Sequence, residues 1–236
     1  MVVAIENLEF GWSPRGPAVL GLERLALARG ERLFVAGPSG SGKSTLLSLL
    51  AGVTTARRGS VQVLDRRLES LSGAARDRFR ADHVGYIFQM FNLIPYLSMV
   101  DNVILPCRFS TSRRERALAR SATLEDEALR LLGHLELARD EWLDRPVTQL
   151  SVGQQQRVAA ARALMGSPEL LIADEPTSAL DADRREIFIR LLFDECAQAG
   201  SSLVFVSHDR ALEPLFDRSV DLARINRALQ HQDGGA

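Results

Sequence analysis

The stretch that decides the fold fits the phosphate-binding loop pattern G-x-x-x-x-G-K-[S/T] throughout and comprises Gly37, Pro38, Ser39, Gly40, Ser41, Gly42, Lys43, Ser44 and Thr45. Its flanks complete a strand–loop–helix unit, because residues 33–36 read as a short buried strand and residues 45–50 as an apolar helix. The glycines let backbone N–H groups curl around phosphate oxygens, and the positive end of the helix points at the anion. The stretch therefore predicts binding of a nucleoside triphosphate, with Lys43 on the β- and γ-phosphates and the Ser44 hydroxyl on Mg²⁺. A Gly/Ser-rich loop that binds nothing is the weaker alternative.

Composition indicates an ordinary globular protein, with 236 residues of which 46% are hydrophobic and 25% charged. The net charge of −1, from 29 basic and 30 acidic residues, favours neither nucleic acid nor an anionic membrane as partner. Cys107 and Cys196 lie far apart without metal-type spacing, which indicates reduced thiols in the cytosol. We see neither a signal-peptide pattern nor an apolar run of about eighteen residues, so we expect any membrane role to come through a partner.

The order of segments predicts an α/β core interrupted by helices. Residues 2–35 alternate apolar and polar positions in short runs, as antiparallel strands do, and residues 92–165 read as almost wholly helical. Further strands are expected at 60–64, 83–88, 170–173 and 202–206, and further helices at 68–81, 183–199 and 212–216. We therefore expect one domain, with an ATP-binding core at 1–89 and 164–226, a helical subdomain at about 90–163, and a disordered tail at 227–236.

A second motif, LLIADE at residues 170–175, places two acids at the end of a buried strand, where open α/β sheets bind ligands. Adjacent side chains on a strand point in opposite directions, so the two carboxylates serve different roles. Asp174 suits Mg²⁺ coordination through water, and Glu175 suits polarisation of an attacking water. An acidic helix cap before Pro176 is the alternative, and the upstream phosphate loop makes it the weaker one.

The third motif, LSVGQQQR at residues 150–157, precedes an Ala-rich helix that Ser151 can cap. Placed shortly before the acidic strand, it resembles the L-S-G-G-Q signature of ATP-binding-cassette (ABC) ATPases. The other marks of that family follow in order. Gln89 resembles the Q-loop glutamine, Asp181 in SALD the D-loop aspartate, and His208 in VSHD the switch histidine, while Trp12 resembles the aromatic residue that stacks on adenine.

The resemblance covers nearly the whole chain and implies a RecA-like P-loop NTPase core with an N-terminal antiparallel β subdomain and an inserted helical subdomain. It also implies two cassettes in a head-to-tail homodimer with two ATP molecules sandwiched between them. Ser151, Gly153 and Gln154 would then face the γ-phosphate bound by the opposite subunit. Gln89 would sense Mg²⁺ and the attacking water, His208 would hold the γ-phosphate, and Asp181 would connect the two sites.

The resemblance further implies a membrane permease as partner, with contact near residues 89–95, and a cytoplasmic location, peripheral on the inner face of the membrane. Within the family, residues 88–95 and 101–103 resemble the branch that powers lipoprotein release and macrolide or peptide export. Phe91 is the predicted contact, whereas Leu93 and Ile94 are expected to pack inside the helical subdomain. A cell-division-type signalling cassette, which moves no substrate, stays an alternative because it would share every catalytic residue. A cassette acting on ribosomes or DNA fits less well, since the chain carries one cassette and no basic excess.

Some positions leave alternatives open. Val152 replaces the first signature glycine, which is costly if the backbone there needs φ > 0 and acceptable otherwise. Phe10 rivals Trp12 as the adenine-stacking residue. Ordinary surface or core roles are expected for His83, His134, His231 and Trp142, and the run from Arg113 to Arg116 is expected to be a solvated helix face.

Overall fold

The computed structural model describes residues 1–13, 15–137, 146–178, 180 and 182–230. The chain divides into two compact units, one formed by Met1–Arg80 with Ser202–Ala236 and the other by Ala81–Ser201. These boundaries differ from the predicted ones at 89 and 164. Helix α8 (Val152–Leu164) packs on β6 (Val84–Ile87), and β6 pairs with β7 (Leu170–Asp174). Strands β6 and β7, which were expected in the ATP-binding core, therefore belong to the same unit as the helices.

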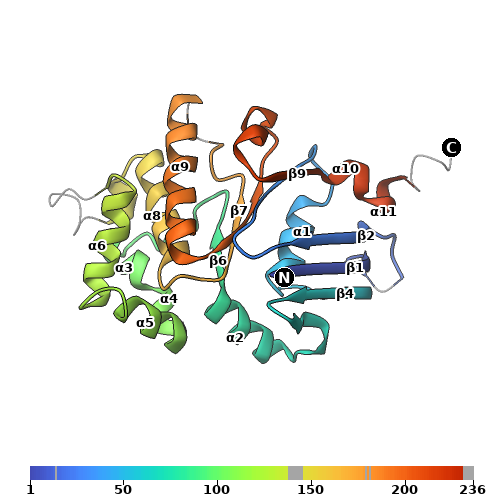
Figure 1. The fold of residues 1–236 in the computed structure, drawn as a ribbon, viewed down its shortest axis with the longest axis horizontal. Helices are drawn as coiled ribbons and strands as arrows, with labels where there is room; N and C mark the ends of the chain where they lie inside the picture. Colours follow the sequence, from blue (N-terminus) through green and yellow to red (C-terminus); the bar gives the residue numbers. More distant parts are fainter. Residues whose placement is uncertain (14, 138–145, 179, 181, 231–236) are drawn as a thin grey trace. The chain divides into compact units, whose positions relative to one another are not determined.

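The first unit contains an antiparallel sheet with strand order β2-β1-β4-β5 (Figure 1). Its strands are β1 (Val3–Phe10), β2 (Leu20–Leu27), β4 (Arg58–Val63) and β5 (Arg66–Arg67). Ile5 of β1 lies opposite Leu25 on one side and Val61 on the other, and all three are buried. This confirms the predicted antiparallel β subdomain, because alternating apolar side chains put one sheet face in the core.

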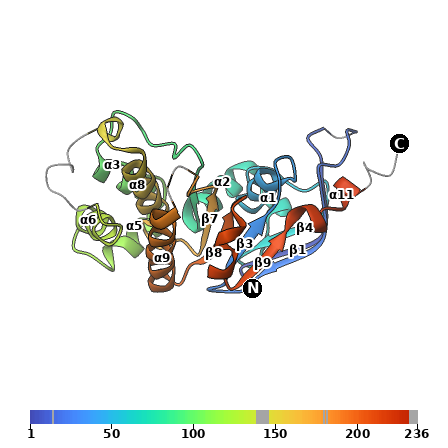
Figure 2. The same cartoon turned by 90° about the horizontal axis from the view of Figure 1, so that it is seen from above.

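The same unit contains a parallel set in which β3 (Arg32–Ala36) lies between β8 (Ser202–Val206) and β9 (Arg218–Asp221). Helix α1 (Lys43–Leu50) follows β3 and contacts β4 (Figure 2). The other helices are the 3₁₀ turns η1 (Leu68–Ser70) and η3 (Arg210–Leu215), together with α2 (Gly73–His83), α10 (Leu222–Ile225) and α11 (Arg227–Gln230). The helix predicted at 68–81 thus begins as a 3₁₀ turn, and the one predicted at 212–216 is a 3₁₀ helix. Residues 227–230 are helical where disorder was expected, because Asn226 and Glu23 hold α11 on β2.

The second unit surrounds the parallel pair β6 and β7 with helices. They are α3 (Met99–Ile104), α4 (Pro106–Phe109), α5 (Thr111–Leu118), α6 (Leu124–His134), the 3₁₀ turn η2 (Val147–Gln149), α8 and α9 (Ala182–Ala199). Helix α8 packs against α3 and α6, so its Ala-rich middle is buried (Figure 1). Helices α3, α4, α5, α6 and α8 fall in the stretch predicted to be helical at 92–165, although residues 92–98 and 119–123 are not helical.

The prediction of a solvated face at Arg113–Arg116 is confirmed for Arg114 and Glu115, which are exposed, and is wrong for Arg113 and Arg116. Arg113 is 3% exposed, and its guanidinium donates to the backbone carbonyls of Met165 (2.8 Å) and Ala163 (2.6 Å). Arg116 donates to the carbonyl of Gly166 at 2.7 Å. The i, i+3 spacing puts both side chains on the inward face of α5, where carbonyls at the end of α8 need donors.

None of the described helices combines the length and the apolar character that crossing a bilayer requires.

Candidate functional site

The phosphate loop has the strand–loop–helix geometry that its sequence predicts. Gly40 and Gly42 have φ values of 81° and 98°, which side chains other than glycine rarely adopt. A Cβ added at Gly37 would lie 2.5 Å from the Ser41 hydroxyl oxygen, so a side chain there would force Ser41 to shift. The Lys43 ammonium donates to the carbonyls of Gly37 (2.6 Å) and Pro38 (3.0 Å), which keeps the cation over the loop.

The Ser41 hydroxyl oxygen is buried and has no hydrogen-bond partner among the described atoms. A buried polar group of this kind costs free energy unless a ligand or water satisfies it. A phosphate oxygen bound in the loop would supply the missing acceptor. The loop therefore fits a polyphosphate chain.

His208 lies at the same edge of the first unit as the phosphate loop. It follows β8, and Val206 of β8 is in register with Val35 of β3, whose strand leads into the loop. The carboxyl ends of parallel strands lie together, and His208 is exposed there. The structure thus places His208 and the phosphate loop at the same edge of the sheet.

Between the rival aromatic residues near the N-terminus, exposure favours Trp12. Phe10 is 6% exposed and belongs to the core of β1, whereas Trp12 is 67% exposed. The Trp12 ring meets Phe10 edge-on, with centroids 5.0 Å apart and planes at 86°. The Phe10 ring therefore contacts Trp12 while most of the Trp12 side chain stays open to a planar base.

In the second unit, Gln89, Asp174 and Glu175 lie at the carboxyl ends of adjacent parallel strands, since Gln89 follows β6 closely, Asp174 ends β7 and Glu175 comes next. Ile87 of β6 is in register with Ala173 of β7, so the residues beyond each strand meet at one sheet edge. Glu175 has a φ of 48°, a left-handed conformation that is uncommon outside glycine and recurs at functional sites. The structure therefore places the glutamine and both acids together.

Two aromatic rings lie beside these acids. Tyr86 stacks on Phe88, with centroids 4.2 Å apart, and Phe88 directly precedes Gln89. Burial and the negative charge of Asp174 raise the pKa of the Tyr86 phenol above its usual range. The hydroxyl thus stays neutral next to the carboxylate.

The signature segment opens α8 with a complete capping box. The Gln154 N–H donates to the Ser151 hydroxyl at 3.3 Å, and the Ser151 N–H donates to the Gln154 side-chain carbonyl at 2.8 Å. Val152 is the first helical residue, has no left-handed backbone and is 52% exposed. Valine is therefore accommodated without strain in place of the glycine.

The signature residues line a hollow of about 200 Å³ in the second unit. Ser151, Gly153 and Gln154 contribute to it, together with Arg157 and Arg184. Arg157 is also bound by Glu136 at 2.9 Å. A helix N-terminus with guanidinium groups nearby attracts an anion. Asp181, Trp142 and His231 lie outside the described residues.

Sequence reasoning missed Arg162, which lies buried in the last turn of α8. Its guanidinium donates to the carbonyls of Phe91 and Asn92, each at 2.6 Å. Those residues have φ values of 59° and 50°, so they form a left-handed turn directly after Gln89. Burial lowers the pKa of Arg162. An arginine within an Ala-rich buried helix was the available sequence signal.

Asn102 in α3 holds the same loop further on. Its side-chain amide accepts from the N–H of Ile94 (2.8 Å) and donates to the carbonyl of Ile94 (3.1 Å) and that of Ser98 (3.0 Å). Met90, by contrast, is 81% exposed. Phe91 is half-buried. The predicted permease loop is thus fixed at its base and presents an apolar side chain to solvent.

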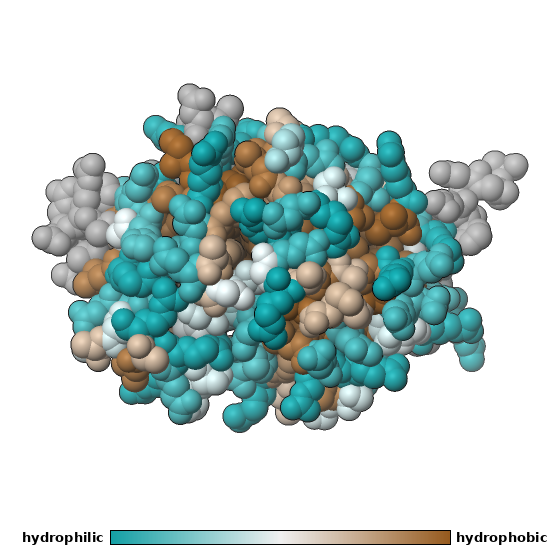
Figure 3. Space-filling view, viewed as in Figure 1, coloured by the Kyte–Doolittle hydropathy of each residue, from teal (hydrophilic) through white to brown (hydrophobic). Residues whose placement is uncertain are grey.

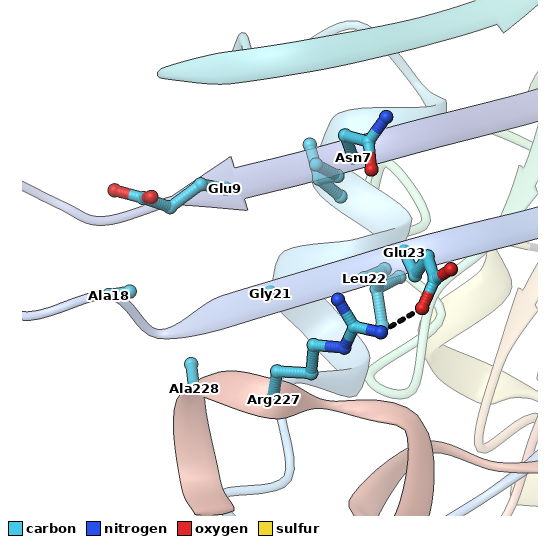
Figure 4. A pocket seen from close by; sticks show the side chains of 9 residues that line it. Asn7, Glu9, Ala18, Gly21, Leu22, Glu23, Arg227 and Ala228 are labelled. Carbon is cyan, nitrogen blue, oxygen red and sulfur yellow. Dashed lines mark hydrogen bonds and ion pairs between the residues drawn. The ribbon is translucent and has the colours of Figure 1, made fainter. Parts of the chain in front are cut away.

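Other surface features lie apart from these residues. The face in Figure 3 is mostly hydrophilic, with apolar groups gathered in small patches between polar ones. A hollow of about 240 Å³ lies beside β1, β2 and α11 (Figure 4), and an ion pair between Arg227 and Glu23 crosses one side of it. Its lining contains none of the site residues predicted from sequence.

Comparison with known proteins gives a consistent result. The family model described as "ABC transporter" matches residues 23–178. The chain is 41% identical over 208 residues to the "Uncharacterized ABC transporter ATP-binding protein YbbA" of Escherichia coli (strain K12), covering 88% of this chain and 86% of that one. It is 39% identical over 223 residues to Rv2564 of Mycobacterium tuberculosis, likewise named an ABC transporter ATP-binding protein, covering 93% of this chain and 64% of that one. Among solved structures it resembles the "post-hydrolysis state of the ATP-binding cassette MJ0796 bound to ADP and Pi", a dimer, with a TM-score of 0.79, 31% identity and coverage of 94% and 95%.

Proposed function

Since this chain belongs to the ABC transporter family as an ATP-binding, ATP-hydrolysing subunit, we propose that it powers a separate membrane permease through ATP-driven closure of a head-to-tail homodimer. The observation that carries this proposal is the open hollow at Ser151, Gly153 and Gln154. A capped helix N-terminus facing solvent gives a second phosphate-binding surface in addition to the phosphate loop. Such a surface suits the nucleotide of a second copy.

In this proposal, residues 37–45 bind the phosphates, Lys43 neutralises the β- and γ-phosphates, and Trp12 stacks on the adenine. Glu175 polarises the attacking water, while His208 holds the γ-phosphate and Gln89 orients the water. Asp181 connects the two composite sites. Positioning and charge stabilisation supply most of the catalysis in such a reaction.

The residues also fit Mg²⁺. The Ser44 hydroxyl and the Asp174 carboxylate offer the hard oxygen ligands that this ion prefers. When bound, the ion would neutralise charge that develops on the phosphates. The described residues contain no cluster of three or more His, Cys, Asp or Glu that could hold a metal alone, so triphosphate oxygens would complete its coordination.

We assign the permease contact to residues 89–95, with Phe91 and the exposed Met90 as the apolar groups. The branch similar to lipoprotein-release and macrolide-export cassettes is proposed on residues 88–95 and 101–103. A signalling cassette similar to the cell-division type is the second candidate, and measured flux in membrane vesicles separates the two. In both cases the chain acts at the cytoplasmic face of the membrane through its partner.

The test uses tagged wild-type and Phe91→Asp chains expressed in the native cell, followed by crosslinking and identification of co-purified membrane proteins. Phe91→Asp is expected to lose the permease while the purified chain still binds ATP. The matched control is Phe109→Asp, because Phe109 is a 74% exposed aromatic residue of the same unit outside the loop. Recovery of the same permease with Phe91→Asp would place the docking site elsewhere.

A further inference from the structure

The segment from α10 to α11 contains a fully buried asparagine whose amide reaches the phosphate loop. Asn226 is 0% exposed. Its side-chain N–H groups donate to the carbonyls of Val19 (3.0 Å) and Ser41 (3.1 Å). Its side-chain oxygen accepts from the N–H groups of Gly21 (2.8 Å) and Ala228 (3.1 Å). The amide therefore joins the phosphate loop, the start of β2 and α11.

Leu222 and Asn226 contact the phosphate loop at two further positions. A Cβ added at Gly37 would lie 3.6 Å from the Cβ of Leu222, and one added at Gly42 would lie 3.5 Å from the Asn226 amide nitrogen. Leu222 opens α10 and is fully buried. Residues 222–226 thus pack against both ends of the phosphate loop.

The bond to Ser41 also sets the direction of a phosphate-binding group. The Ser41 carbonyl and the Gly42 N–H belong to one peptide unit, and the described chain contains no cis peptide. In a trans unit these groups point in opposite directions. By holding the carbonyl, Asn226 fixes the Gly42 N–H on the far side, away from itself. Phosphate loops bind their ligand through such backbone N–H groups.

Helix α11 secures the other end of the link. Arg227 forms its ion pair with Glu23 of β2, and Ala228 lies beside Gly21 (Figure 4). The Ala228 N–H is satisfied by Asn226, which caps the turn. The amide of Asn226 is therefore held from both directions.

We propose that Asn226 is a positioning residue of the nucleotide site, which holds the phosphate loop in its binding conformation without touching the nucleotide. The inference rests on the proposed phosphate-loop site. Nucleotide affinity then depends on residues 222–230, which lie outside the phosphate-loop motif. Loss of the amide donors releases the Ser41–Gly42 peptide and weakens binding.

The experiment measures ADP affinity by calorimetry, with steady-state ATPase kinetics, for the purified full chain and its variants. Asn226→Asp keeps the side-chain size but replaces the donors with an acceptor that faces two carbonyl oxygens. We expect ADP to bind at least tenfold more weakly and the KM for ATP to rise similarly, while kcat stays within twofold. Arg227→Ala removes the exposed ion pair but leaves the four hydrogen bonds of the Asn226 amide in place, so it should bind ADP like the wild type.

Asn102→Asp is the matched control for folding stability, because Asn102 is equally buried and holds a loop in the other unit. It should lower the melting temperature without weakening ADP binding. If Asn226→Asp does not fold, Asn226→Ser retains one hydroxyl donor and should bind ADP three- to tenfold more weakly. ADP affinity within twofold of the wild type, in whichever of these variants folds, overturns the inference.

Lys43→Ala separates this inference from the site on which it rests. If Lys43→Ala leaves ADP affinity unchanged, the phosphate-loop site itself is wrong. If Lys43→Ala weakens binding and the Asn226 variants do not, only the positioning role is wrong.

Discussion

Arg162→Met tests whether α8 holds the loop after Gln89 in place. The substitution removes the hydrogen bonds from the guanidinium to the carbonyls of Phe91 and Asn92 and keeps most of the side-chain volume. Hydrogen bonds from a charged donor contribute about 1.5–3 kcal/mol each. The buried guanidinium also has a desolvation cost, which the substitution relieves and which offsets part of the loss.

Backbone strain adds to the effect. Phe91 and Asn92 both have left-handed backbones, which cost roughly 1–2 kcal/mol per residue in the absence of compensating contacts. Without the guanidinium the loop relaxes toward ordinary φ values. We expect a net loss of about 2 kcal/mol in loop stability. That corresponds to a roughly 30-fold larger population of the open loop.

The assay is native-state hydrogen exchange of residues 88–95, read by mass spectrometry without nucleotide. Exchange there should accelerate roughly 30-fold in Arg162→Met while α9 keeps its protection. Arg157→Met is the control, because Arg157 lies on the same helix but donates to Leu135. The reasoning fails if residues 88–95 exchange at the wild-type rate, or if protection falls equally throughout the second unit.

Three further predictions address the site and the stability of the chain. Glu175→Gln should bind ATP normally, hydrolyse it at least a hundredfold more slowly and shift to a dimer on gel filtration with Mg-ATP; wild-type turnover would move the catalytic role to another residue. A Ser151→Arg chain mixed with a Lys43→Ala chain should show more ATPase activity than either alone, whereas a structure in which Ser151 contacts the nucleotide of its own subunit would refute the sandwich. Burial alone would raise the pKa of Glu127, but hydrogen bonds from Arg130 and Ser121 outweigh burial and lower the pKa below its ordinary value of 4.5. The ionised Glu127 therefore stabilises the fold near neutral pH, and this stabilisation is lost progressively as the pH falls below about 4.5. Glu127→Gln should therefore reduce the melting temperature at pH 7 but flatten its decline toward pH 4, and an unchanged acid profile would contradict this.

The sequence predicted those parts of the fold that local patterns determine. Strands β3, β7 and β8 are short apolar runs, and Ser151 was expected to cap the helix that follows it. The pairing of β3 with β8 came from the structure alone. The site residues within each unit consequently fall at the sheet edges where strand ends were expected.

What the sequence did not reveal depends on long-range polar contacts. Arg113 looked like a surface residue because its run is charged, yet its partners are carbonyls about fifty positions away. Asn226 showed no sign of a role in the site, because its partners Val19 and Ser41 lie far away in the sequence, near the other end of the chain. Local propensity carries no information about such pairs, since each residue alone is compatible with solvent exposure.

These long-range contacts give α8 a position that its sequence motif alone does not explain. Its N-terminal end presents Ser151 and Gly153, whereas its last turn holds the Gln89 loop through Arg162, and carbonyls at the same end accept from Arg113 of α5. The helix between the two ends is uninterrupted from Val152 to Leu164. A close-packed helix that is hydrogen-bonded to its neighbours through side chains either moves as a rigid body or loses those hydrogen bonds. A shift of the Gln89 loop therefore either displaces the signature end of α8 or releases Arg162, and the exchange rate of residues 88–95 with and without a docked permease distinguishes the two.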